Sequence, residues 1–512
     1  MKRITTLMLA MALVLGSVSI AKADGIDVKV KGQWDFSFGW ADNLHFRESY
    51  MPQQSASRYG KNKRENKGDN FQASHRIRTQ VNFITSEYLQ AVLMFEIGNI
   101  NWGQKGSGGA LDTDGINVET KLAYLDWVIP NTEIAIRMGL QTLTLPSTPM
   151  GSPLFDADVA GIVASAPITD WLSAALFWIR PFDYDYNGGW DDNRDLSDET
   201  DAFGILLPMT FDGVKFTPYF IWGRVGVNSG AYEYLFAIGD YKGYAAGDRS
   251  KGAITDRDHA QVWWLGGHLE LTLWDPLVFN LEGIYGNLSR ANLSGFGNTT
   301  QSAWGGGEMD IKASGWIIAA TLDYKLDFMT PGIFGWYASG DDENTFKDGK
   351  IGRMPVLGND GGSFGPTSFG SAGYYGINQF SNSGTIIGTG TGTWGVGIQL
   401  ADISFIEDLK HTIRVAYYKG TNNPDNFKYR YNPYGYFLQY AADGFYLTDN
   451  DHVWEVNFDH QYKIYENLTA VLELGWLRLH ADKQTWGGTY GRTGLKENDN
   501  AWKAQIAFRY SF

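Results

Sequence analysis

A short acidic motif is the first candidate for metal chemistry. Asp183, Asp185 and Asn187 reproduce the first half of a calcium-binding loop, in which spaced oxygen atoms surround a hard cation. The twelfth position of that pattern is Arg194, where a calcium loop requires a glutamate. With Asp191 as a further oxygen donor, the motif predicts at most a weak calcium site, and a solvated acidic loop tip is the alternative.

No residue pattern predicts a catalytic centre. The chain has no cysteine, which excludes disulfides, zinc–cysteine sites and thiol nucleophiles. Its eight histidines form no HExxH motif and no close pair at ligand spacing. The glycine–threonine repeat at 388–393 lacks the lysine of a phosphate-binding loop. A serine–histidine–aspartate triad has no fixed spacing in the sequence, because its residues come together only in the folded protein. Nothing in the sequence indicates such a triad, so we expect neither enzyme activity nor a cofactor.

The composition indicates a protein built from β-strands. The 512 residues include 62 glycines, only 15 prolines and 15% aromatic residues, whereas glycine usually accounts for about 7%. This mixture is typical of many strands joined by glycine-rich loops. The net charge of −15 argues against a nucleic-acid partner, because phosphate binding needs basic patches.

The N-terminal segment is typical of a secretory signal peptide. Two basic residues precede an apolar run from Leu7 to Ile20, and Ala21 and Ala23 supply small residues at the cleavage positions. The run is shorter than the ~20 apolar residues that a membrane-spanning helix needs. We therefore predict a signal peptide over residues 1–23, cleavage before Asp24, and a single mature domain over 24–512.

The mature chain repeats a two-residue alternation. Val28, Val30 and Trp34 fall on one face of the first segment, and Lys29 and Lys31 fall on the other. This period is the signature of a strand with one apolar and one polar face. Several runs exceed ten residues, longer than the ~5–6 usual in soluble proteins. Further runs lie near residues 77–83, 263–273, 316–328 and 454–462.

The connections between these runs alternate in length. Eight short links and nine long polar segments predict 18 strands, and 16 is the alternative because the runs near 158–166 and 203–211 are weak. In the run near 468–480, Arg478 falls on the apolar face, which predicts a bulge or a position at the membrane interface. The short links lie near residues 86, 130, 169, 212, 275, 330, 407 and 466, and the long segments near 41–70, 99–117, 142–158, 181–201, 225–258, 288–310, 340–393, 420–450 and 482–499.

Short turns on one side and long loops on the other are the plan of an outer-membrane β-barrel. Every backbone polar group in hydrocarbon needs an internal partner, and a sheet meets that demand only by closing on itself. The apolar face would then meet lipid and the polar face would line a lumen. A soluble propeller or tandem sandwich is the alternative. Aromatic residues near strand ends would form two interfacial girdles: Trp40, Trp127, Trp178, Trp222, Trp274, Trp336 and Trp394.

The last residues carry a second, independent signal. Phe508, Tyr510 and Phe512 share one face of an alternating segment, which looks like the terminal strand that the barrel-assembly machinery reads in bacterial outer-membrane proteins. Together with the opening segment VKVKGQWDFSF at 28–38, the mature chain resembles the homotrimeric outer-membrane porins of sulfate-reducing bacteria. The resemblance covers residues 24–512. It implies a Gram-negative outer membrane, a homotrimer, and contact with lipopolysaccharide.

The resemblance also implies a constriction formed by the third long loop. In trimeric porins this loop folds into the barrel, and its acidic groups face basic residues on the wall. Here the third loop is 142–158. Opposed charges across a narrow gap would orient polar solutes; ordinary lumen residues and loop-closing aspartates are the alternative. The candidate constriction residues are Arg76, Arg78, Arg137, Asp156 and Asp158.

We therefore predict an outer-membrane porin of about 18 strands that forms a water-filled channel for passive diffusion of small hydrophilic solutes and ions. A channel selective for sugars or organic acids is the main alternative, and an adhesin or structural barrel is a third. Aromatic residues in the long loops could provide a path for sugars: Tyr374, Tyr375, Tyr434 and Tyr436.

Overall fold

The computed structural model describes residues 25–44, 71–112, 118–183, 199–226, 259–294, 308–357, 364–369, 390–425, 446–486 and 497–512. The predicted signal peptide with Ala21, Ala23 and Asp24 lies outside these residues. So do three of the calcium candidates, Asp185, Asn187 and Asp191, and the four loop tyrosines.

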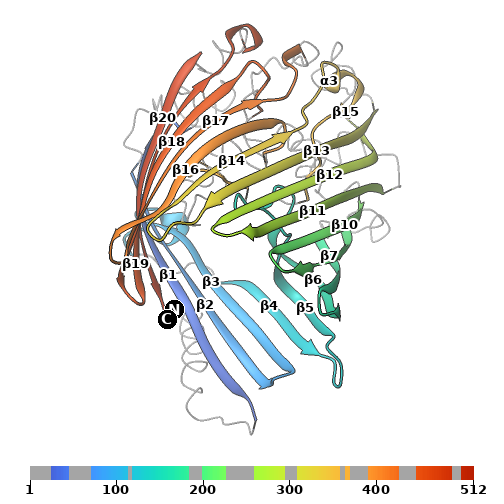
Figure 1. The fold of residues 1–512 in the computed structure, drawn as a ribbon, viewed down its shortest axis with the longest axis vertical. Helices are drawn as coiled ribbons and strands as arrows, with labels where there is room; N and C mark the ends of the chain where they lie inside the picture. The colour runs from blue at the N-terminus through green and yellow to red at the C-terminus, as the bar shows by residue number, and fades with distance from the viewer. Residues whose placement is uncertain are drawn as a thin grey trace.

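Almost all described residues belong to one sheet of 20 strands (Figure 1). The helical elements among them are short and include η1 (Lys105–Ser107), α3 (Thr345–Asp348) and one helical turn at 483–486. No helix in the described part of the chain is long and apolar enough to cross a membrane. The strands are β1(Asp27–Asp42), β2(Gln72–Ser86), β3(Leu89–Asn101), β4(Glu119–Val128), β5(Ala135–Thr144), β6(Asp156–Thr169), β7(Leu172–Asp183), β8(Glu199–Leu206), β9(Met209–Phe211), β10(Val214–Val225), β11(Ala260–Trp274), β12(Leu277–Ser294), β13(Glu308–Tyr324), β14(Thr330–Ala338), β15(Lys350–Ile351), β16(Thr393–Ile406), β17(Leu409–Gly420), β18(His452–Tyr465), β19(Leu468–His480) and β20(Asn498–Ser511).

The sheet closes on itself, because β1 pairs antiparallel with both β2 and β20. β8 and β9 form one interrupted wall strand, since both pair with β7 and β10. β15 is a two-residue parallel addition to β13. With β8 and β9 counted as one strand and β15 set aside, the 20 strands form a closed antiparallel barrel of 18 wall strands. This number was predicted, and the alternative of 16 strands is wrong. The interruption falls at Leu207 and Pro208, where proline has no backbone N–H to give to the ladder.

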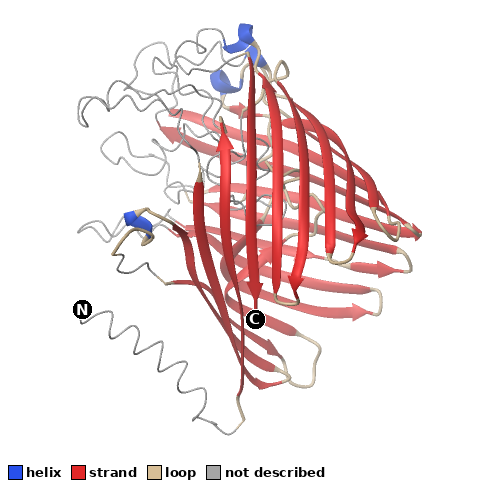
Figure 2. Cartoon of the chain, turned by 90° about the vertical axis from the view of Figure 1, so that its left-hand side faces the viewer, coloured by secondary structure: helices blue, strands red, loops and turns tan. Residues whose placement is uncertain are grey.

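The eight short links join strands at one end of the barrel, where Figure 2 shows the tight turns and the C-terminus. The nine longer connections lie at the other end. The predicted alternation of turn lengths is therefore confirmed.

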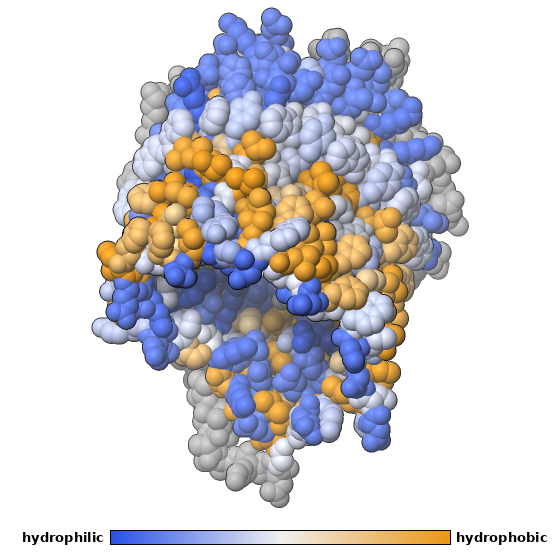
Figure 3. Space-filling view, viewed as in Figure 1, coloured by the Kyte–Doolittle hydropathy of each residue, from blue (hydrophilic) through white to orange (hydrophobic). Residues whose placement is uncertain are grey.

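The outward face of the wall is apolar. Trp34, Leu265, Ile398 and Trp454 are each more than 40% exposed, and Figure 3 shows hydrophobic side chains in a broad band over the strands. Six of the seven predicted girdle tryptophans are partly or fully exposed. The prediction for Trp336 is wrong.

Trp336 points inward and is only 4% exposed. Its indole N–H donates to the hydroxyl of Thr393 at 2.9 Å, and its ring packs edge-on against Phe364, 5.6 Å away. Tyr337, the next residue, is the one that faces outward. The alternation of apolar and polar residues fails here because loops fill this part of the lumen.

Arg478 lies on the outward face of β19, near the long-loop end. The register between β19 and β20 is unbroken over the whole strand. Of the two explanations predicted for its apolar-face position, the structure therefore agrees with an interface position and not with a bulge.

The hydrophobic core lies inside the barrel. Inward side chains of the wall, such as Ile221, Trp264 and Leu477, are buried against segments of the long loops, including Leu154 and Val356. Core and lipid-facing surface thus occupy opposite faces of the same strands. This arrangement confines any open water path to the part of the wall that the loops do not cover.

The seam between β1 and β20 provides a test of the closure. The backbone of Gly32 exchanges two hydrogen bonds with Phe512, at 2.9 and 3.0 Å. A β-carbon at Gly32 would lie 2.5 Å from the Phe512 ring and 2.6 Å from the carbonyl oxygen of Arg78. We expect Gly32→Val to lower the free energy of unfolding by about 2 kcal/mol through overpacking, measured by urea titration of the protein in detergent micelles.

Gly283→Val is the matched control, because nothing lies within 4 Å of a β-carbon at that outward position. If the two variants lost the same free energy of unfolding, the contact between Gly32 and Phe512 would not contribute to the stability of the seam.

Candidate functional site

The inward wall at the seam carries a carboxylate shared by two arginines. Asp35 on β1 accepts hydrogen bonds from Arg76 of β2 at 3.3 Å and from Arg509 of β20 at 2.8 Å. Gln33 donates a third at 2.6 Å. The alternation that turns Trp34 outward necessarily turns Asp35 inward, and the cross-strand register of Asp35 with Arg76 and Arg509 brings the three charges together.

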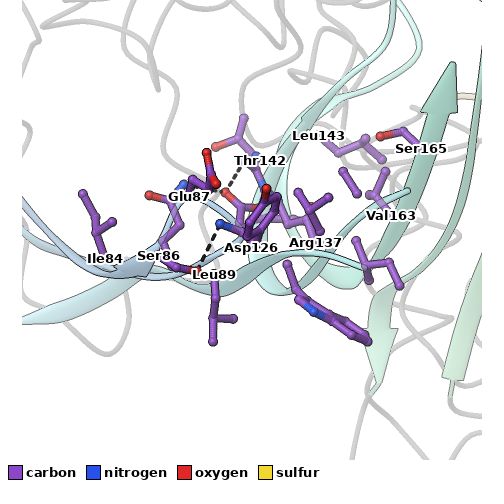
Figure 4. A pocket seen from close by; sticks show the side chains of 17 residues that line it. Ile84, Ser86, Glu87, Leu89, Asp126, Arg137, Thr142, Leu143, Val163 and Ser165 are labelled. Carbon is purple, nitrogen blue, oxygen red and sulfur yellow. Dashed lines mark hydrogen bonds and ion pairs between the residues drawn. The ribbon is translucent and has the colours of Figure 1, made fainter. Parts of the chain in front are cut away.

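Two further pairs continue along this wall. Arg78 of β2 donates to Glu96 of β3 at 2.6 Å. Arg137 of β5 forms a bidentate pair with Asp126 of β4, at 2.6 and 2.9 Å, and lies over the ring of Tyr124. Figure 4 shows Asp126 and Arg137 together in a pocket of about 600 Å³ beside the turn between β2 and β3.

In each of these pairs the cation is more exposed than the carboxylate. The side chains of Arg76 and Arg509 are 18% and 30% exposed, against 4% for Asp35. Arg137 is 40% exposed and its partner Asp126 is 23% exposed. In these pairs the guanidinium groups are therefore more accessible to the lumen than the carboxylates that hold them.

Asp156 and Asp158 do not pair with the three arginines. Asp156 and Asp158 are the first and third residues of β6, on the same face of the strand as the exposed Ile162, and each accepts a hydrogen bond of 2.5 Å from a threonine of β5. Asp158 also accepts one from Lys121 of β4. The arginines and the aspartates that the sequence singled out thus pair with neighbours along the wall, and a role for all five in a constriction stays a prediction.

The segment between β5 and β6 reaches far across the barrel. The backbone N–H of Thr148 donates to Glu282 of β12 at 3.4 Å. Met150 accepts a backbone hydrogen bond from Gly365, and Leu154 accepts one from Leu357. Both partners belong to the long connection between β14 and β16, so two loops meet inside the lumen.

The inward fold of the second loop, between β14 and β16, was not predicted from the sequence. Ser368 receives a hydrogen bond from Asn457 of β18 at 2.7 Å, and its carbonyl oxygen accepts one from Lys503 of β20. Glycines at inward wall positions were the available signal: a β-carbon at Gly315 would lie 2.3 Å from the backbone nitrogen of Met354. Only a glycine lets the loop lie so close to the strand.

The wall beneath this loop is closed to water. Arg414 and Asp459 pair at 2.7 Å with both side chains fully buried, and Lys503 and Glu473 are also buried. The charged wall of β1–β5 is the part left partly exposed. On the face drawn in Figure 3, a hollow opens between β1–β5 and the strands from β11 to β14, and hydrophilic residues line it.

Metal chemistry finds no support in the described residues, which contain no group of three acidic or histidine side chains placed to hold an ion. Asp183, the one calcium candidate among them, pairs with Arg180 at 3.1 Å.

Two aspartates outside the strands tie the long loops together at the external end. Burial raises the pKa of Asp451, although Thr448, Trp486 and the backbone N–H of Asp482 donate to it. Hydrogen bonding from Thr485 lowers the pKa of Asp482.

The shared carboxylate allows a stability test. Asp35→Asn would leave Arg76 and Arg509 facing each other without a compensating charge, so we expect about 2 kcal/mol lower free energy of unfolding at pH 7. Asp126→Asn is the control, because its partner Arg137 is well hydrated and such pairs contribute less than about 1 kcal/mol. Equal losses in urea unfolding would contradict a special role for Asp35.

Comparisons with known proteins give distant likenesses only. No protein-family model matches the chain, and no curated protein matches it. Among solved structures, the outer membrane protein OprD from Pseudomonas aeruginosa is 12% identical, with 96% of each chain covered and a TM-score of 0.48. OccAB1 of Acinetobacter baumannii is 11% identical, with 96% of this chain and 99% of that chain covered and a TM-score of 0.48. At these identities and TM-scores, the likenesses assign neither a family nor a function.

Proposed function

We propose that this protein is an outer-membrane channel for passive diffusion of small hydrophilic solutes and ions. The observation that carries the proposal is the closed barrel of 18 strands with an apolar outer face and a charged, partly exposed inner wall. A barrel of this size leaves room for an aqueous path. We expect such a channel to act without a cofactor and without a chemical step.

The exposed arginines favour anionic solutes, such as organic acids. In the arginine–carboxylate pairs on the wall of β1–β5 and β20, the carboxylates are the more buried partners: Arg76, Arg78, Arg137 and Arg509 against Asp35, Glu96 and Asp126. Bidentate guanidinium groups match the geometry of a carboxylate. The net charge of the whole chain counts for little here, because exposed loop charges are screened within ~10 Å.

A homotrimer completes the proposal, as in the porins of sulfate-reducing bacteria that the terminal segments resemble. The barrel-assembly machinery would insert the chain through the segment that ends in Phe508, Tyr510 and Phe512, and lipid with lipopolysaccharide would surround it. The outward, apolar face of β20 is consistent with such an insertion, since Trp502 and Tyr510 are both exposed.

Single-channel conductance of the purified protein in a planar bilayer is the first test. We expect discrete openings that close in three equal steps, one for each barrel of a trimer. Folded, inserted protein without conductance would overturn the diffusion channel and favour an adhesin or structural barrel. Single steps of closure would overturn the trimer alone.

Replacing the exposed arginines tests the preference for anions. With Arg76, Arg78 and Arg137 all changed to alanine, we expect the reversal potential under a salt gradient to move towards the cation value, because the positive surface of the path is lost. The triple change of the same residues to lysine is the control that keeps the charge. An unchanged reversal potential in the alanine variant would contradict the assignment of the path to this wall.

A further inference from the structure

A groove on the lipid-facing side of the barrel leads to unpaired cations. The outer surface of the wall is most recessed where Ala320 of β13 lies opposite Gly335 of β14, because these are the two smallest residues in their cross-strand row. Around them lies an apolar groove of about 650 Å³, bordered by Ile333, Val396 and Tyr417. Towards the short-turn end of the barrel, this groove continues into a second groove of about 430 Å³, and the two grooves share several lining residues.

The same row of residues leads from the groove to a charge. Gly335 pairs with Val396, Val396 with Tyr417, Tyr417 with Trp454, and Trp454 with Arg478. Tyr417 and Trp454 stand 4.9 Å apart as the aromatic border of the groove. Figure 1 shows β14, β16, β17 and β18 side by side along this path.

One row nearer the long loops, three more nitrogen-bearing side chains face outward. Lys419 of β17 lies opposite His452 of β18, which lies opposite His480 of β19. The two imidazole rings stack with their centroids 4.6 Å apart. We call Lys419, His452, Arg478 and His480 the basic rim.

The two permanent cations of the basic rim have no partner among the residues that the structure describes. The side chains of Lys419 and Arg478 form no ion pair or hydrogen bond with any described residue, and no carboxylate faces outward on β17, β18 or β19. Asp482, two residues after His480, accepts hydrogen bonds from the backbone N–H and hydroxyl of Thr485, both at 2.7 Å. Unpaired cations at a lipid-facing surface are costly unless an anion meets them.

On the other side of the barrel, also at the long-loop end, the outward cations are paired. There Arg180 pairs with Asp201 at 2.9 Å, and Arg224 contacts His259, which contacts Glu199 at 3.2 Å. These outward cations are neutralised by the protein itself. The basic rim is therefore not a general property of the long-loop end.

We propose that the basic rim and the groove together bind one lipopolysaccharide molecule of the external leaflet. Its phosphate group would lie against Lys419 and Arg478, and an acyl chain would fill the groove at Ala320 and Gly335. The position of the cations at the long-loop end selects the external leaflet, and the aromatic pair between cations and groove lies where headgroup and hydrocarbon meet. The inference rests on the proposed outer-membrane location.

Binding of lipid A, the phosphorylated and acylated anchor of lipopolysaccharide, tests the site. The full-length protein in a zwitterionic detergent would be titrated with lipid A, and the bound fraction counted by native mass spectrometry. Neutralising both cations with Lys419→Gln and Arg478→Gln should weaken binding roughly 30-fold. The double variant Lys419→Arg with Arg478→Lys exchanges the two residue types but keeps both positive charges, so it should keep the affinity for lipid A.

The groove is tested separately. Ala320→Phe should fill it and weaken lipid A binding, whereas Ala470→Phe, an outward position on β19 outside the groove, should not. Unchanged binding in the glutamine variant, or equal effects of the two phenylalanine variants, would overturn the proposal. If phosphatidylglycerol bound with the same affinity as lipid A, the site would accept any anionic lipid, and the proposal of a lipopolysaccharide site would also be overturned. A change in subunit number with Ala320→Phe would assign the groove to a second copy of the chain instead.

Conductance of the same variants separates this inference from the proposed function. None of the substituted side chains faces the lumen, so each variant should keep the wild-type single-channel conductance. Protein that binds lipid A without conducting would refute the channel and leave the lipid site standing. Conducting protein that does not bind lipid A would refute the lipid site alone.

Discussion

The structure depends on the need to satisfy every backbone hydrogen bond without help from solvent. In hydrocarbon, each unpaired N–H or C=O group costs several kcal/mol, so a flat sheet with two free edges could not persist there. The pairing of β1 with β20 removes both edges. Once the sheet is closed, alternation assigns every side chain either to the bilayer or to the interior. The outward tryptophans and the inward Asp35 follow from the same rule, one residue apart.

Much of this could be predicted from the sequence, because strand alternation and turn length are local properties. All eight short turns lie where the pattern placed them, and the 18 wall strands do so to within a few residues at their long-loop ends. The partners of Arg76, Arg78 and Arg137 could not be predicted, because Asp35, Glu96 and Asp126 are set by the register between strands. Register depends on cross-strand packing, which periodicity alone does not reveal.

The contacts inside the barrel could not be predicted from local sequence patterns. Trp336 reads as a girdle residue because it stands near a strand end, yet the connection between β14 and β16 folds back and covers it. Contacts such as that between Ser368 and Asn457 join residues 89 positions apart, and no spacing rule anticipates them. The same loops decide which lumen charges are buried, as Arg414 is, and which stay hydrated, as Arg137 does.

The seam also has a consequence for how the chain folds. Asp35 and Arg509 meet across 474 positions of sequence, so the contact that completes the barrel is among the most distant in the molecule. Such contacts form slowly, because the entropy of closing a long loop opposes them until many other interactions are in place. Until then, β1 and β20 each expose an open edge to neighbouring chains. We therefore expect the wall to be completed late in folding, and a protein caught before that step would be prone to pair with other chains.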